Sequence, residues 1–159
     1  MSRRAAAAAI LIALVSPVLA ATGVAQTSEL RLTPEEVAAL PGVGPGTGTS
    51  GVNGVQSRIL AGNPAKAGPY TIEIRVPPHT RIAAHGHKDD RSAVVVAGLW
   101  YFGYGNVAAD ALVRPLPPGS FYTEPAGVVH FAQTRDAPAT VYISGFGPTS
   151  TDYVASPEP

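Results

Sequence analysis

The most constraining feature of this sequence is a series of short β-type segments between residues 69 and 150. Each segment is rich in β-branched and aromatic residues, and Gly, Pro or Asp residues separate it from the next. Six such segments stand out, at 70–76, 92–96, 99–104, 120–123, 128–133 and 140–145. Short strands with frequent turn signals are typical of an antiparallel sandwich or barrel, and no helical periodicity interrupts them. The sequence therefore predicts an all-β domain over residues 69–150.

Residues 1–25 have the order of parts found in a secretory signal peptide. Arg3 and Arg4 form the positive start, an uncharged apolar run follows, and small residues allow cleavage after Ala20 or after Ala25. The apolar run is short for the ~20 residues that a membrane span needs. We therefore expect an exported protein, periplasmic or extracellular, with no stable membrane association once the leader is cleaved.

Residues 26–68 predict a short helix followed by a flexible arm. Thr33 is a suitable helix cap, Pro34 suits the first turn, and Glu36 completes a capping box. From 42 to 55 the chain is Gly-rich with almost no bulky side chains, which is typical of a mobile linker. Residues 151–159 are expected to form a tail after the barrel.

Charge and cysteine content exclude several classes of function. The chain has 11 Lys+Arg against 11 Asp+Glu and no run of like charges, so it lacks the basic face of a nucleic-acid binder. With no Cys, it has no disulfides, zinc knuckles, Fe–S ligands or thiol nucleophile. The exposed sheet edges of a small barrel also leave open the formation of a homodimer.

The histidines carry the candidate chemistry, because two of the four form the pair His85-Gly86-His87. Residues i and i+2 of a strand point to the same face, so both imidazoles would project together and supply adjacent ligands to a divalent metal. A third ligand has to come from elsewhere, and His130 is the candidate. His79 follows two prolines and is expected in an exposed turn.

A second motif lies at residues 119–130, where Gly119, Pro125, Gly127 and His130 stand in the pattern Gly-x5-Pro-x-Gly-x2-His. Together with the earlier His-x-His, this resembles the two-part signature of the cupin family. The Pro125–Gly127 turn would join two strands, and the returning strand would place His130 inside the domain. The resemblance covers about half the chain and implies a jelly-roll barrel, a double-stranded β-helix, with a divalent metal at its centre.

In the cupin pattern the metal ligands are the two His of the first motif, an acid after them and the His of the second motif. His85, His87 and His130 carry over, but Arg91 stands at the usual place of the acid. An arginine never deprotonates and is no ligand for a cation. Glu124 is the preferred relocated acid; alternatively it pairs with Arg91 and does not touch the metal.

The sequence allows two interpretations for Asp89 and for the tyrosines of the β-type segments. Asp89 shares strand parity with His85 and His87, although it sits in a charged stretch that favours a solvated turn. Tyr122, like Tyr101 and Tyr104, either lines a pocket mouth or packs a half-buried sheet face. We take Arg91 and Tyr122 as the candidate substrate-binding residues, because an arginine suits an anionic ligand such as a carboxylate.

Three functions therefore remain open at the level of sequence. The first is an exported metal-dependent enzyme, an oxygenase, isomerase or lyase, that acts on a small organic molecule. The second is a non-catalytic module that binds a metal or a small ligand, for example as a sensor. The third is a stable barrel with a vestigial site. Three imidazoles accept Mn, Fe, Ni, Cu or Zn, so the metal is not identified.

Overall fold

The computed structural model describes residues 28–45 and 49–155. The predicted signal peptide at 1–25 and the last four residues of the predicted tail lie outside the described residues. The elements in chain order are α1 (Pro34–Ala39), β1 (Gln56–Gly62), β2 (Gly68–Val76), β3 (Arg81–Gly86), β4 (Arg91–Gly98), β5 (Trp100–Tyr104), the 3-10 helix η1 (Asp110–Leu112), β6 (Arg114–Leu116), β7 (Phe121–Glu124), β8 (His130–Gln133), β9 (Ala139–Gly147) and β10 (Asp152–Tyr153).

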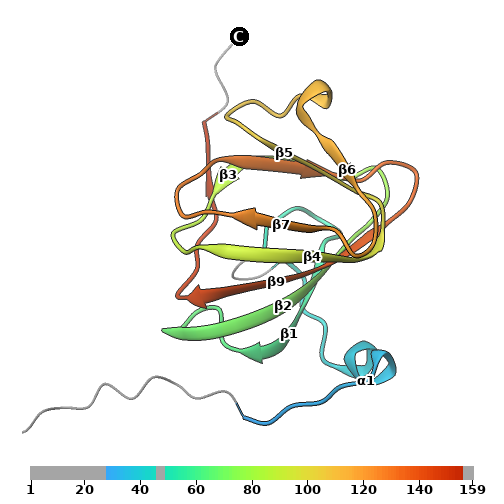
Figure 1. Ribbon diagram of the computed structural model, residues 1–159, viewed down its shortest axis with the longest axis vertical. Coiled ribbons are helices and arrows are strands. Elements are labelled where there is room, and N and C mark those ends of the chain that lie inside the picture. Colours follow the sequence, from blue (N-terminus) through green and yellow to red (C-terminus); the bar gives the residue numbers. More distant parts are fainter. Residues whose placement is uncertain (1–27, 46–48, 156–159) are drawn as a thin grey trace, which may run out of the picture.

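The strands form two five-stranded antiparallel sheets (Figure 1), one in the order β1-β2-β9-β4-β7 and the other in the order β10-β3-β8-β5-β6. From β2 to β5 and from β6 to β10 successive strands alternate between the sheets, whereas β1 pairs with β2 and β5 with β6 as sequence neighbours. This is the jelly-roll arrangement, and it confirms the predicted all-β fold. Each of the six predicted β-type segments overlaps a strand.

The core between the sheets follows from the alternation of apolar and polar residues along the longer strands. On β2, Tyr70, Ile72, Ile74 and Val76 are all buried, because every second side chain of a strand faces the same side. β4 and β9 add further aliphatic side chains, and Trp100 lies in the same cluster. Polar side chains enter this interior near the end of β3, where a small cavity lies.

The predicted helix is present and is confirmed as a capped element. Thr33 accepts a hydrogen bond from the backbone of Glu36, and the Glu36 carboxylate accepts one from the backbone of Thr33, which is the capping box. The helix lies beside the β1 edge of the first sheet (Figure 1), where the Arg58 side chain donates to the Leu40 carbonyl. Among the described residues, no helix is long and apolar enough to cross a bilayer.

The barrel extends beyond the boundaries expected from the sequence. β1 pairs with β2 from residue 56 onward, so the barrel starts before residue 69. Its sequence lacks a regular apolar alternation, because it is an edge strand with little burial. At the other end, β10 pairs with β3, so the expected tail contains an ordered strand.

The Gly-rich arm also departs from the expectation of a mobile linker. Thr49, Ser50 and Val55 are buried, and Val43 forms an isolated bridge with Ser57. The described part of this segment is therefore packed against the barrel rather than extending from it. Small side chains made it look like a linker in the sequence, but they also allow a chain to lie close against a sheet.

Candidate metal centre

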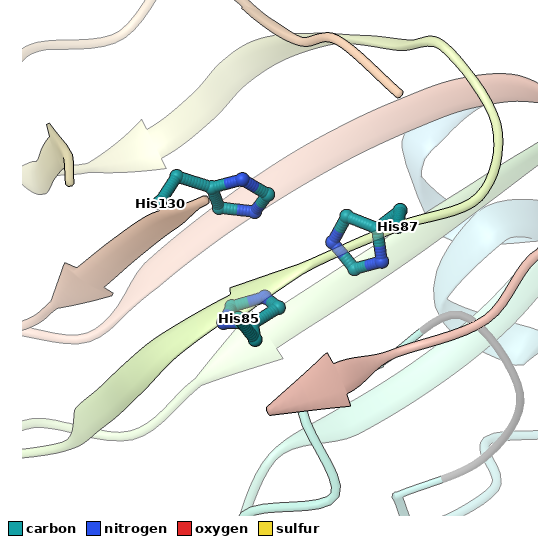
Figure 2. A group of neighbouring side chains, drawn as sticks. All are labelled: His85, His87 and His130. Carbon is teal, nitrogen blue, oxygen red and sulfur yellow. The ribbon is translucent and has the colours of Figure 1, made fainter. Parts of the chain in front are cut away.

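Three histidines meet inside the barrel, on the sheet that contains β3 and β8. His85 lies on β3 and pairs in register with His130 at the start of β8, and His87 follows β3 by one residue. One ring nitrogen from each of the three lies within 4.8 Å of the others, and all three residues are buried. Figure 2 shows the imidazoles grouped around a common point. The structure thus brings together the three histidines that the sequence singled out.

A register irregularity in β3 places His85 in this group. Ile82 faces the core, so strict alternation would turn His85, three residues later, toward the opposite side. The pairing with β8 shifts between Ile82 and His85, and both residues are buried. An irregularity of this kind re-aims a side chain, so the His-x-His pair faces inward together.

The turn before β8 positions His130 as the motif predicts. Gly127 has φ of 72°, a backbone conformation that favours glycine, and the Val128 amide donates to the Pro125 carbonyl at 3.0 Å. The Gly127 amide also donates to the carbonyl of His87 at 2.8 Å, which ties this turn to the end of the first motif. Both motifs are therefore held together by backbone contacts as well as by their side chains.

Backbone carbonyls fix the orientation of all three imidazoles. The Nδ1 atom lies 2.7 Å from the Ala83 carbonyl in His85, 2.5 Å from the Ser150 carbonyl in His87 and 3.1 Å from the Val128 carbonyl in His130. A carbonyl only accepts, so each Nδ1 carries the proton and each Nε2 keeps a lone pair; in His87 the 2.5 Å contact of Nδ1 with Ser150 is shorter than its 3.3 Å contact with Arg91, which only donates.

The Nε2 atoms of His87 and His130 are buried and have no hydrogen-bond partner among the described residues. Glu124 adds a third acceptor, because its Oε2 lies 3.5 Å from His87 Nε2 and 3.9 Å from His130 Nε2. The two ring nitrogens are buried acceptors without a donor, and such acceptors carry a large desolvation cost. A bound cation would satisfy them, so these residues fit a metal ion.

Arg91 and Glu124 form a buried ion pair beside the histidines. They lie opposite one another on β4 and β7, and Arg91 Nε donates to Glu124 Oε2 at 2.6 Å. Pairing is the alternative that the sequence left open for Glu124, and the structure shows that contact. Direct ligation of a metal by Glu124 stays a prediction.

Burial makes the three imidazoles hard to protonate. It is the largest cause that lowers the pKa of His85 and of His130 to about 4. The pKa of His87 falls further, to about 2, because the positive charge of Arg91 adds to the burial. All three rings are therefore neutral at physiological pH, which is the form that binds metals.

The chain is similar to known proteins in its fold. No protein-family model matches the chain, and no curated protein matches it in sequence. Solved structures do match its fold. The polyketide cyclase RemF of Streptomyces resistomycificus aligns with a TM-score of 0.61 at 14% identity, over 82% of this chain and 89% of that one.

Two matching structures are described as cupins. An RmlC-like cupin from Shewanella frigidimarina aligns with a TM-score of 0.55 at 17% identity, over 76% of this chain and 93% of that one. A sugar phosphate isomerase from a cupin superfamily, from Silicibacter pomeroyi, aligns with a TM-score of 0.54 at 21% identity, over 75% of this chain and 80% of that one. The chain has the cupin fold. It spans about half the length, 48%, of a DMSP lyase that it also matches, with a TM-score of 0.50 at 19% identity over 59% of this chain.

The space around the histidines of this cupin barrel is small. The cavity has a volume of about 20 Å³. A cavity needs roughly 10–15 Å³ to hold one water molecule, so this one has room for an ion or a water. An organic ligand would not fit between the three imidazoles without movement of the cavity wall.

Two residues that sequence reasoning missed line this cavity. Thr49 and Ser50, from the Gly-rich arm, line it. The Tyr153 hydroxyl on β10 donates to the Ser50 carbonyl, and the Tyr153 ring lies 5.4 Å from the His85 ring. The Thr151 hydroxyl donates to the Thr49 carbonyl at 2.8 Å. No local pattern predicts these contacts, because the two segments are about a hundred residues apart in the chain.

The structure places the other candidate residues as follows. Asp89 is buried rather than in a solvated turn, because the Tyr70 hydroxyl donates to it at 2.8 Å and the Thr149 hydroxyl at 2.6 Å. It is not part of the histidine cluster. His79 is exposed in a turn, as predicted. Tyr122 is buried, lines the cavity and accepts a hydrogen bond from Trp100 Nε1 at 3.2 Å.

We expect the metal-free cupin barrel to lose stability as the pH falls below about 6.5. A histidine in the unfolded chain has a pKa near 6.5, whereas the folded values lie at about 4 or lower, so the unfolded state binds more protons. The contribution of the three neutral histidines to the free energy of unfolding is fully present above pH 6.5. It is lost as the pH falls toward 4. Urea titrations of chelator-treated protein between pH 7.5 and 4.5 measure the free energy of unfolding. We expect this free energy to decrease by about 2 kcal/mol or more over that range.

The matched variants are His130→Gln and His79→Gln. Removing the buried His130 should reduce the dependence of the free energy of unfolding on pH, whereas removing the exposed His79 should leave it unchanged. If the free energy of unfolding depended on pH equally in wild type and in His130→Gln, the assignment of His130 as buried and neutral would be contradicted.

Proposed function

We propose that this protein binds a divalent metal ion through Nε2 of His85, His87 and His130, and acts on a small organic molecule at that ion. The observation that carries the proposal is the pair of buried Nε2 atoms without a hydrogen-bond partner. The three histidines are close enough to hold one ion, and their Nδ1 contacts orient the lone pairs toward it. Mn, Fe, Ni, Cu or Zn all suit three imidazoles.

When bound, such an ion would supply Lewis acidity, or oxygen chemistry if it is redox-active. The residues of the chain contribute the surroundings. Arg91 holds the Glu124 carboxylate at the edge of the histidine cluster, where it faces two ring nitrogens. Tyr122 and Trp100 form a wall of the cavity and are joined by a hydrogen bond. We propose that Arg91 and Tyr122 contact the substrate.

The similar structures support a proposal for the class of reaction, but not for one particular reaction. The similar structures are described as a polyketide cyclase, a sugar phosphate isomerase and a DMSP lyase. For this chain we propose a metal-dependent lyase, isomerase or oxygenase that uses a small, anionic organic substrate. The test is a turnover screen against organic acids, under air and without oxygen, with metal-loaded and chelator-treated protein. Turnover that disappears with the metal supports an enzyme.

One observation favours a second function, a non-catalytic metal-binding module. The cavity of about 20 Å³ has room for an ion but not for an organic ligand, and Ser50, which lines it, accepts a hydrogen bond from Tyr153. Stoichiometric metal without turnover, and with no change in metal content or spectrum on adding organic acids, would support this reading. A protein that takes up no divalent metal at all would contradict both functions and leave a vestigial site.

We also propose that the protein is exported. The support is the order of charged, apolar and small residues in 1–25, which precede the described barrel. Intact-mass measurement of the protein from its native host should give a chain that begins after Ala20 or after Ala25. A product that starts at Met1 or Ser2 would contradict the proposal.

A further inference from the structure

A second hollow lies outside the histidine cavity, along the edge strands β6 and β7. It has a volume of about 450 Å³ and is lined by residues of β5, β6 and β7 and by Leu112 of η1. β6 is the last strand of one sheet and β7 the last strand of the other. Small-molecule sites typically measure about 300–1,000 Å³, so this groove has room for an organic ligand that the histidine cavity lacks.

The walls of the groove are aromatic and aliphatic. Tyr104, Leu112 and Phe121 line it while exposing about half or more of their surface, 48%, 56% and 65%. Large exposed apolar side chains that gather around one hollow mark a binding surface. Tyr104 is also held in place, because its hydroxyl donates to the Thr123 carbonyl of β7 at 2.6 Å. The wall is therefore preformed for a flat apolar group.

The groove is lined by one positively charged side chain. Arg114 is the one charged residue among those that line it. The structure gives Arg114 no ion pair and no side-chain hydrogen bond within the described part of the chain, and it is exposed. The nearby Asp110 is engaged by Arg81 at 2.8 Å. A planar guanidinium beside apolar walls is suited to a carboxylate or a similar oxyanion.

The floor of the groove is shared with the histidine cavity. Phe102 and Tyr122 line both hollows, and their ring centroids are 4.2 Å apart. The Phe102 ring also stacks on the His130 ring, with the centroids 5.3 Å apart. A ligand in the groove is thus separated from the histidines by one layer of aromatic rings, and its binding does not need a metal.

We propose that this groove is a binding site for a small aromatic carboxylate, with the ring against Tyr104 and Phe121 and the carboxylate on Arg114. The aromatic walls select a flat body, and the free guanidinium selects the negative charge. The site is distinct from the proposed metal centre and does not rest on that function.

The probe for the test is 2-naphthoate, with the neutral 2-naphthamide as its matched control. Trp100 is the only tryptophan of the chain and is hydrogen-bonded to Tyr122 of the groove floor, so its fluorescence reports binding. We expect saturable binding of 2-naphthoate with a Kd below about 1 mM, weakened about tenfold in Arg114→Gln. The amide should bind more weakly than naphthoate to wild type, and equally to wild type and to Arg114→Gln.

The matched control is Arg81→Gln, an exposed arginine on β3 outside the groove, which should bind 2-naphthoate like wild type. Phe121→Ser should weaken the binding of both probes. Chelator treatment should leave binding unchanged. Unaltered affinity in Arg114→Gln, or binding that is lost with the metal, would overturn the proposal. Because metal content is measured separately, failure here is distinguishable from failure of the histidine site.

Discussion

His130→Ala is expected to lose its bound divalent metal on gel filtration, while wild-type protein loaded in the same way retains about one ion per chain. Three protein ligands leave little redundancy, so losing one should weaken binding by more than the 10–100-fold that loss of an outer hydrogen-bond partner costs. His85→Ala and His87→Ala should behave in the same way, because one ring nitrogen of each belongs to the same cluster within 4.8 Å. Elemental analysis of the four proteins measures the effect.

His79→Ala is the control for this series. His79 lies in an exposed turn, and its Nδ1 lies 4.0 Å from Asp136 Oδ1. It should retain metal like wild type. Loss of metal from His79→Ala with retention in His130→Ala would show that the site is misassigned and would remove the role given to the second motif. Circular dichroism of each variant separates loss of a ligand from loss of the fold.

Glu124→Gln is expected to lower the free energy of unfolding by about 3 kcal/mol or more, measured by urea denaturation at pH 7. The substitution keeps the shape of the side chain but removes the negative charge that Arg91 contacts at 2.6 Å, with both residues almost completely buried. Breaking a buried ion pair by removing one partner typically costs about 3–5 kcal/mol, because the remaining charge is left in a medium of low polarity.

Two further variants test the cause of that loss. In the double variant Arg91→Met with Glu124→Gln no charge remains unpaired, so it should recover much of the stability lost in Glu124→Gln. The exposed pair Arg81–Asp110 has a similar distance, 2.8 Å, and Asp110→Asn should cost less than about 1 kcal/mol. Equal losses in Glu124→Gln and Asp110→Asn would show that the buried pair does not stabilise the fold.

The same variants separate the two roles considered for Glu124. If Glu124 only pairs with Arg91, the double variant retains metal as tightly as wild type. If its Oε2, which lies 3.5 Å from His87 Nε2, also ligates the ion, the double variant recovers stability but binds metal more weakly. Comparing metal affinity with the free energy of unfolding therefore assigns the role.

Local patterns in the sequence were sufficient for six of the ten strands that the structure describes and for the histidines. The alternation of apolar residues in β2 and the Pro125–Gly127 turn are properties of neighbouring residues, and each predicts its own conformation. The spacing of His85, His87 and His130 within two motifs likewise indicated a common site. β1, with its irregular burial at a sheet edge, has no such pattern and was missed.

The tertiary structure determined how these strands and turns contact one another. The irregularity of β3 that turns His85 inward depends on its pairing with β8, and the contact of Arg91 with Glu124 depends on the pairing of β4 with β7. The cavity is lined in part by Ser50, which accepts a hydrogen bond from Tyr153, 103 residues away. The sequence determined the residues capable of this chemistry, because composition and spacing are local. The size of the cavity and the charges beside it come from contacts between distant segments, which only the folded chain specifies.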